Sequence, residues 1–301
     1  MLQNRTDTPA GESRMYTTLI SADELAQALA GPQADRVRVL DCGFELTDPG
    51  AGKRQFDAGH LPGAAYVHLE DTLSGPKTGT NGRHPLPDPG ALARALAALG
   101  VGDGTQVVAY DNAGGMYAAR LWWLLRWIGH QSVAVLDGGV GAWRAAGHPL
   151  TTDAPMARAP GNLRARDGGL ATLRYAQLLE TRGADGPLVL DARAPDRYRG
   201  ENETLDAVGG HIPGARNRFF RDNLAADGRF LPADRLRQDF QARIGDRSPA
   251  DVVHQCGSGV TACHNLLAME IAGLSGAALY PGSWSEWSAQ AGAPVATGPE
   301  S

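Results

Sequence analysis

The chain has 301 residues, about twice the usual length of a single domain, so we expect two domains with separate cores. Its content of 43% hydrophobic and 20% charged residues is that of an ordinary globular protein. A formal net charge of -5 argues against a dedicated nucleic-acid binder, because such proteins neutralise phosphates with Lys and Arg. The longest apolar run, around Leu121 to Leu125, is too short to cross a membrane.

Residues 1–16 are polar and lack the apolar stretch of a secretory signal. We therefore expect a flexible N-terminal tail and a cytoplasmic protein. The three cysteines, Cys42, Cys256 and Cys263, are too few and too odd in number for a disulfide framework. A reducing compartment would leave all three as thiols.

The first half of the chain carries the sequence signals of two helix starts. Ser21 and Glu24 have the spacing of a capping box before an apolar run that reaches Ala30. Asp88 and the proline after it precede an Ala- and Leu-rich run that should stop at Gly100. Short apolar strands between such helices predict an α/β fold, in which a parallel sheet has helices on both faces.

The same order of motifs occurs twice along the chain. A strand-like run ending at Asp41 precedes His60-Leu-Pro-Gly-Ala, and one ending at Asp191 precedes His211-Ile-Pro-Gly-Ala. The repeats are offset by about 145 to 150 residues, which is the size of a domain. They predict two homologous domains, at 17–150 and 170–298. The Ala-, Pro-, Arg- and Gly-rich segment 151–169 is the expected linker.

The two halves differ at the end of a later strand-like run, where the first has Asp111 and the second has Cys256. Loops at the carboxyl ends of parallel strands bind ligands, so this is where chemistry is expected. Only the second domain would carry a nucleophile, and Asp111 is interpreted as a loop cap.

The segment Cys256-Gly-Ser-Gly-Val-Thr261 leads directly into an apolar helix that should end at Gly273. Its two glycines allow positive φ angles, and its backbone N–H groups together with the helix N-terminus would surround the sulfur. We therefore expect Cys256 to be a reactive thiolate near neutral pH. Cys42 and Cys263 are interpreted as small buried hydrophobes.

Other readings of the same loop can be weighed by spacing. A phosphatase loop needs an arginine six residues after the cysteine, and Ala262 stands there. A zinc site at His254, Cys256, Cys263 and His264 would lack the usual Cys-x-x-Cys spacing, so no metal is expected. The Gly-x-Ser-x-Gly motif of serine hydrolases is absent.

With these motifs, residues 17–296 resemble the tandem-rhodanese sulfurtransferases. The resemblance is carried by the two His-x-Pro-Gly-Ala segments, by Leu136-Asp-Gly-Gly-Val-Gly-Ala-Trp143, by Asp191-Ala-Arg193 with Arg197-Tyr198, and by the Cys256 loop. It implies two rhodanese-like domains, of which the second is catalytic. The loop is similar to that of the 3-mercaptopyruvate branch, whereas the thiosulfate branch typically has basic residues at the positions of Gly257 and Ser258.

The resemblance also implies a two-step reaction without a cofactor. The Cys256 thiolate takes sulfur from 3-mercaptopyruvate or thiosulfate as a persulfide and passes it to cyanide, a thiol or thioredoxin. The resemblance implies that one arginine binds the sulfur donor, that the loop backbone holds the charged sulfur, and that the hydroxyl of Ser258 hydrogen-bonds the substrate. The implied binding residues are Arg197, Gly257, Ser258, Gly259, Val260 and Thr261.

The resemblance departs from the 3-mercaptopyruvate branch at one position. That branch usually has a second arginine nine residues after the first, and Asp206 stands there. This local pattern is more similar to the thiosulfate branch. Arg193 or Arg199 is considered as a source of the missing charge, and His60 as a minor contributor at the cleft. Three alternatives stay open: thiosulfate as the main donor, a persulfide carrier with little turnover of small donors, and phosphatase or arsenate-reductase activity.

Overall fold

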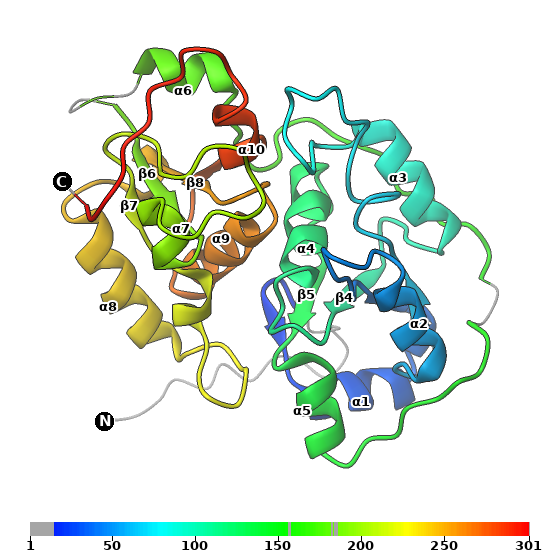
Figure 1. The fold of residues 1–301 in the computed structure, drawn as a ribbon. Coiled ribbons are helices and arrows are strands. Elements are labelled where there is room, and N and C mark those ends of the chain that lie inside the picture. Colours follow the sequence, from blue (N-terminus) through cyan, green and yellow to red (C-terminus); the bar gives the residue numbers. More distant parts are fainter. Residues whose placement is uncertain (1–14, 156–157, 182, 184–185, 301) are drawn as a thin grey trace, which may run out of the picture.

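The computed structural model describes residues 15–155, 158–181, 183 and 186–300, and it shows two α/β domains (Figure 1). The expected tail lies outside these residues, apart from its last two. The elements of the N-terminal domain are β1 (Leu19–Ile20), α1 (Ala22–Ala30), η1 (Ala34–Arg36), β2 (Val37–Asp41), α2 (Ala51–Ala58), β3 (Ala65–Tyr66), α3 (Pro89–Ala98), β4 (Gln106–Tyr110), α4 (Ala118–Trp127), β5 (Val133–Leu136) and α5 (Gly139–Ala145).

The C-terminal domain repeats the plan with a smaller sheet. Its elements are α6 (Tyr175–Thr181), β6 (Leu188–Asp191), α7 (Pro195–Arg199), β7 (Arg216–Asn217), η2 (Phe220–Asn223), α8 (Ala233–Ile244), η3 (Pro249–Asp251), β8 (Val252–Gln255), α9 (Thr261–Ile271), β9 (Ala278–Leu279) and α10 (Ser283–Trp287).

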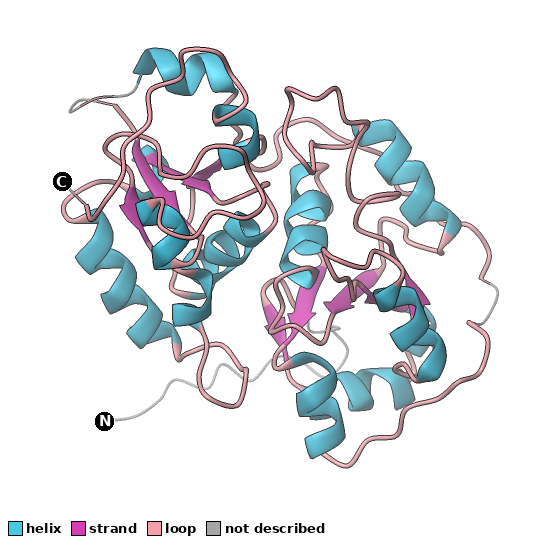
Figure 2. Cartoon of the chain, viewed as in Figure 1, coloured by secondary structure: helices cyan, strands magenta, loops and turns pink. Residues whose placement is uncertain are grey.

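Both sheets are parallel throughout, as the alternation of strands and helices predicts. Their strand orders are β1-β5-β4-β2-β3 and β7-β6-β8-β9. Figure 2 shows the strands of each domain enclosed by helices. Across the described ranges, none of the helices is long and apolar enough to span a membrane.

The predicted helix caps are present. Ser21 and Glu24 form a capping box at the start of α1, and the Asp88 side chain accepts a hydrogen bond from the backbone N–H of Ala91 at the start of α3. Helix α9 ends at Ile271, and Gly273 follows with φ +71°. Caps are local features, so sequence spacing alone predicts them well.

Each sheet has an apolar core on both faces. One face of the N-terminal sheet packs against α1, α2 and α5, and the other packs against α3 and α4. In the C-terminal domain, α6, α7 and α10 cover one face, and α8 and α9 cover the other. Helices α4 and α9 pack against each other, so that one hydrophobic cluster runs through both domains. This shared core holds the two sheets in a fixed position relative to each other, with Cys256 at the end of one of them.

Candidate active site

Cys256 directly follows β8 and is almost fully buried, with 2% of its surface exposed. Its backbone N–H donates to Oγ of Ser283 at 3.2 Å, and its carbonyl accepts from the N–H of Trp284 at 2.9 Å. The sulfur accepts a hydrogen bond from the backbone N–H of Gly259 at 3.1 Å. The loop therefore folds back on the thiol, and α9 begins immediately after it, as the sequence predicts.

The two loop glycines are needed for different reasons. Gly259 has φ +78°, and a Cβ there would lie 2.4 Å from the carbonyl oxygen of Pro281. Gly257 does not have a positive φ, which corrects the expectation for this residue. A Cβ at Gly257 would instead lie 2.7 Å from Nη2 of Arg83 and 3.5 Å from Nη2 of Arg197. Glycine at position 257 thus leaves room for the Arg83 guanidinium, which a Cβ there would displace, whereas the distance to Arg197 is an ordinary contact.

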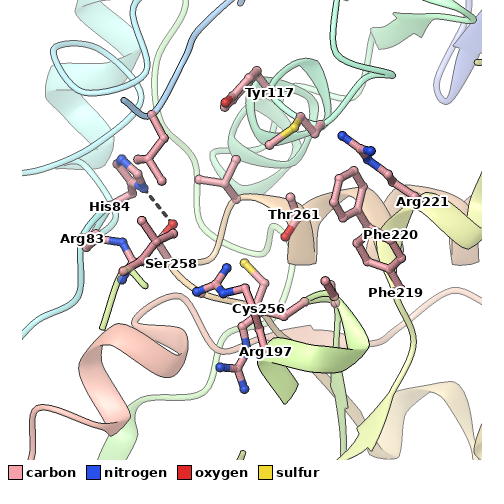
Figure 3. Close-up of a pocket in the computed structure, with 18 of the residues that line it drawn as sticks. Arg83, His84, Tyr117, Arg197, Phe219, Phe220, Arg221, Cys256, Ser258 and Thr261 are labelled. Atoms are coloured by element: carbon pink, nitrogen blue, oxygen red, sulfur yellow. Dashed lines mark hydrogen bonds between the residues drawn. The ribbon is translucent and has the colours of Figure 1, made fainter. Parts of the chain in front are cut away.

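The sulfur faces a cavity of about 270 Å³ between the domains (Figure 3). The N-terminal domain contributes Leu46, Leu69, Arg83, His84, Met116 and Tyr117 to its wall, and the C-terminal domain contributes the active loop and the segments around α7 and η2. Gly257, Ser258, Val260 and Thr261 all line this cavity, and so does Arg197. The structure thus brings these candidate residues together around Cys256.

Ser258 is hydrogen-bonded across the domain boundary. Its Oγ lies 2.8 Å from Nδ1 of His84, and Nε2 of His84 lies 3.7 Å from a carboxylate oxygen of Glu70. Burial, followed by the positive charge of Arg120, lowers the pKa of His84 to about 3, so the ring is neutral at physiological pH. A neutral ring with its proton on Nε2, towards Glu70, would accept the hydrogen bond of the Ser258 hydroxyl on Nδ1.

Two arginines from different domains face the cavity next to Gly257. Arg197, in α7, binds the Glu203 carboxylate at 2.8 Å. Arg83, in the loop before α3, binds the Asp206 carboxylate, and Nη2 of Arg197 lies 3.7 Å from the same carboxylate. Position 206, where the 3-mercaptopyruvate branch usually has an arginine, is thus occupied by an aspartate that binds one. Asp206 holds an arginine of the other domain at that place.

The three residues considered as minor contributors lie elsewhere or are already engaged. Arg193 lines the cavity but is buried in a bidentate pair with Asp191. Arg199 is outside the cavity and pairs with Glu201 at 2.7 Å. His60 is also outside it, with Nδ1 2.8 Å from the carbonyl oxygen of a residue in α2. Arg199 and His60 thus do not line the cavity that holds Cys256.

The corresponding loop of the N-terminal domain has Asp111 in place of Cys256, and this side chain caps its own loop. Both carboxylate oxygens of Asp111 accept backbone hydrogen bonds of 2.8–2.9 Å, from the N–H groups of Ala113, Gly115, Tyr117 and Ala118. The side chain thus fills the cradle of N–H groups that its own loop forms, as a loop cap does. A cradle already filled by a carboxylate leaves no place for a second anion.

The other two thiols are packed in the core. Burial raises the pKa of Cys263 to about 12 and that of Cys42 well above its usual value. Both side chains are buried and free. No cluster of His, Cys, Asp and Glu that could hold a metal ion occurs within 15–155, 158–181, 183 and 186–300.

Arg83, His84 and Glu70 were not predicted from the sequence. They lie on the long connection between β3 and α3, which has no helical or strand periodicity. The length of this connection was the one available signal, since long irregular loops in compact domains are often functional.

Comparison with known proteins shows the family to which the chain belongs. A model of the rhodanese-like domain matches the chain twice, over residues 21–146 and 174–290. The chain belongs to the rhodanese family and contains two copies of its domain, as the internal repeat predicts.

Relatives of nearly the same length identify the kind of enzyme. The chain is 48% identical over 282 residues to a probable 3-mercaptopyruvate sulfurtransferase of Pseudomonas aeruginosa, which covers 93% of this chain and 98% of the relative. It is 39% identical over 283 residues to a putative thiosulfate sulfurtransferase of Mycobacterium tuberculosis, covering 93% and 97%. The crystal structure of SseA from Escherichia coli, a 3-mercaptopyruvate enzyme by its description, matches with a TM-score of 0.75 and 29% identity over 89% of this chain and 99% of that one. The protein is a sulfurtransferase.

Proposed function

We propose that the protein transfers sulfur from 3-mercaptopyruvate to a thiophilic acceptor through a persulfide on Cys256. The observation that carries this proposal is the free thiol of Cys256 at the wall of the interdomain cavity, which receives a backbone N–H bond within a loop at a helix N-terminus. Such a setting favours a thiolate nucleophile.

In the first step the Cys256 thiolate attacks the donor sulfur. A bond forms between the two sulfur atoms, the carbon–sulfur bond of 3-mercaptopyruvate breaks, and its electron pair stays on the carbon as the enolate of pyruvate. The Gly259 N–H is in place to stabilise charge on the sulfur, and the Ser258 hydroxyl can hydrogen-bond the enolate oxygen. A proton taken up by the enolate completes pyruvate.

In the second step an acceptor such as cyanide, a small thiol or thioredoxin attacks the outer sulfur of the persulfide. The sulfur–sulfur bond breaks, and Cys256 leaves as a thiolate ready for another donor. The three cysteines are free thiols in the structure, and we infer that the protein works in a reducing compartment such as the cytoplasm.

The cavity walls support 3-mercaptopyruvate over thiosulfate. Arg197 and Arg83 flank Gly257, where the fork of a guanidinium can hold the donor's carboxylate. A basic side chain at position 257, of the kind that suits a dianionic donor, would have to displace the Arg83 guanidinium. Thiosulfate is the second candidate, because Asp206 stands where the 3-mercaptopyruvate branch usually has an arginine, a local pattern more similar to the thiosulfate branch.

The test is the initial rate of thiocyanate formation from cyanide with each donor, measured on wild type and on Cys256→Ser. We expect the wild type to prefer 3-mercaptopyruvate by about tenfold or more in kcat/KM, a difference of roughly 1.4 kcal/mol. The variant should be inactive with both donors. A preference for thiosulfate would show that thiosulfate, and not 3-mercaptopyruvate, is the main donor. Turnover by Cys256→Ser would overturn the proposal. If neither donor is used while Cys256 is reactive, a persulfide carrier takes its place.

A further inference from the structure

Arg120, in α4 of the N-terminal domain, is a fully buried arginine with 0% of its surface exposed. A guanidinium keeps its charge in proteins, and a buried charge normally has a carboxylate partner. Within the part of the chain that the structure describes, Arg120 forms no ion pair with any Asp or Glu. Its position therefore needs another explanation.

The guanidinium of Arg120 instead joins three backbone carbonyls from two domains. Nη1 donates to the carbonyl oxygen of Gly259 at 3.1 Å, in the active-site loop. Nη2 donates to the carbonyl oxygens of His84 at 3.1 Å and of Leu73 at 3.4 Å, both on the long connection before α3. One side chain thus ties the loop that carries the nucleophile to the loop that carries His84.

Gly259 is the residue whose N–H donates to the sulfur of Cys256. Its carbonyl oxygen accepts from Arg120 and also from the thiol of Cys263, at 3.2 Å. The N–H and the carbonyl oxygen of Gly259 lie in consecutive peptide planes that meet at its Cα, where φ is +78°. Holding the Gly259 oxygen therefore restrains the backbone at Gly259 and, through it, the direction of the N–H that faces the nucleophile.

The charge of Arg120 also reaches the sulfur atoms of the site. Burial raises the pKa of Cys263 to about 12, the charge of Arg120 acts to lower it, and Cys256 acts to raise it. Arg120 and Cys256 thus each lie within electrostatic reach of Cys263. In a site with little water, a fixed positive charge at this range stabilises a thiolate more than it would at the surface.

We propose that Arg120 is the positioning residue of the active-site loop. From the domain that has no nucleophile, it aligns the Gly259 N–H with the sulfur of Cys256, and its buried charge stabilises the negative charge on that sulfur. This proposal rests on the proposed role of Cys256 as nucleophile. It gives the first domain a part in the chemistry, beyond forming one wall of the cavity.

The test compares wild type with Arg120→Met, Arg120→Lys and a control, Arg126→Met. Arg126 lies on the same helix and pairs across the domain boundary with Glu270 at 3.3 Å, without contact to the active-site loop. The readout is the rate at which iodoacetamide alkylates Cys256, followed by mass spectrometry between pH 5 and pH 10. This assay uses no sulfur donor, so it stays informative even if the proposed function fails.

We expect Arg120→Met to need a pH about one unit higher for half of its limiting alkylation rate, and so to react about tenfold more slowly at pH values well below the wild-type midpoint. Arg126→Met should match wild type. Arg120→Lys keeps the charge but has one donor nitrogen in place of the two that reach the two loops, so its pH profile should stay near that of wild type while its kcat for sulfur transfer falls severalfold. An unchanged pH profile in a folded Arg120→Met overturns the proposal. If that variant does not fold, Arg120→Lys decides, and wild-type kcat in it overturns the proposal.

The remaining charged or titratable groups near the sulfur are kept in every variant, so they do not differ between the profiles: Arg83, His84, Tyr117, Arg193, Arg197, Arg221 and Cys263.

Discussion

The charge balance of the donor pocket should set which donor it prefers. A cluster of three guanidinium groups and three carboxylates, with no net charge, lies beside Cys256: Arg83, Arg193, Arg197, Asp191, Glu203 and Asp206. Asp206→Asn keeps an oxygen that can accept from Arg83 and leaves the cluster with one net positive charge. Thiosulfate is a dianion, whereas 3-mercaptopyruvate has a single carboxylate charge. The substitution should therefore favour thiosulfate.

The size of the effect follows from Coulomb's law. Two unit charges about 8 Å apart, in an effective dielectric constant of about 20, interact by about 2 kcal/mol. We halve this to about 1 kcal/mol, because the Arg83 side chain is 23% exposed and water screens the pair. The dianion gains this attraction twice and the monoanion once. The ratio of kcat/KM for thiosulfate to kcat/KM for 3-mercaptopyruvate should thus rise about fivefold.

The assay is initial-rate thiocyanate formation with each donor at constant ionic strength. Glu201→Gln is the matched control, since it removes an equal charge from the exposed pair with Arg199, outside the cavity. The control should leave the ratio unchanged. A ratio in Asp206→Asn that stays at the wild-type value, or falls, would refute the charge-balance reasoning.

Three further predictions concern stability and the loop. Asp111→Ala should lower the free energy of unfolding by about 3 kcal/mol in urea titrations, because buried N–H groups lose their acceptor, and a change below about 1 kcal/mol would contradict the loop-cap interpretation. Burial lowers the pKa of His84, His254 and His264 to about 3, 3 and 4, so their stabilising effect is complete above pH 6.5 and is lost as the pH falls towards 4. The free energy of unfolding should drop by about 1.4 kcal/mol per ring for each pH unit in this window, and a flat profile from pH 7 to pH 5 would rule this out. Gly257→Ala should raise KM for 3-mercaptopyruvate severalfold with little change in the melting temperature, since its methyl group displaces a neighbouring guanidinium, and an unchanged KM would show that the crowding does not matter.

The features that the sequence predicted are those encoded locally. The capping box at Ser21, the end of the strand at Cys256 and the helix after it all depend on residues close together in the chain. The repeat also predicted two parallel sheets, because short apolar strands between helices allow few other arrangements. For these elements spacing and residue type were sufficient.

The features that were missed depend on contacts between distant segments. Arg83 meets Asp206 across 123 positions, and His84 meets Ser258 across 174. The loop that carries Arg83 and His84 has no periodic pattern, and nothing local indicates that it reaches the other domain. For the same reason Asp206 was interpreted as the loss of an arginine, whereas it is the partner of one.

The passage of sulfur through Cys256 can be observed directly. The wild-type protein is incubated with 3-mercaptopyruvate, freed of donor and digested for tandem mass spectrometry. We predict one additional sulfur atom on the peptide that contains Cys256, its removal by cyanide with release of an equal amount of thiocyanate, and no additional sulfur on Cys256→Ser. Normal turnover with no additional sulfur on Cys256, or with the sulfur on Cys42 or Cys263, would contradict the mechanism.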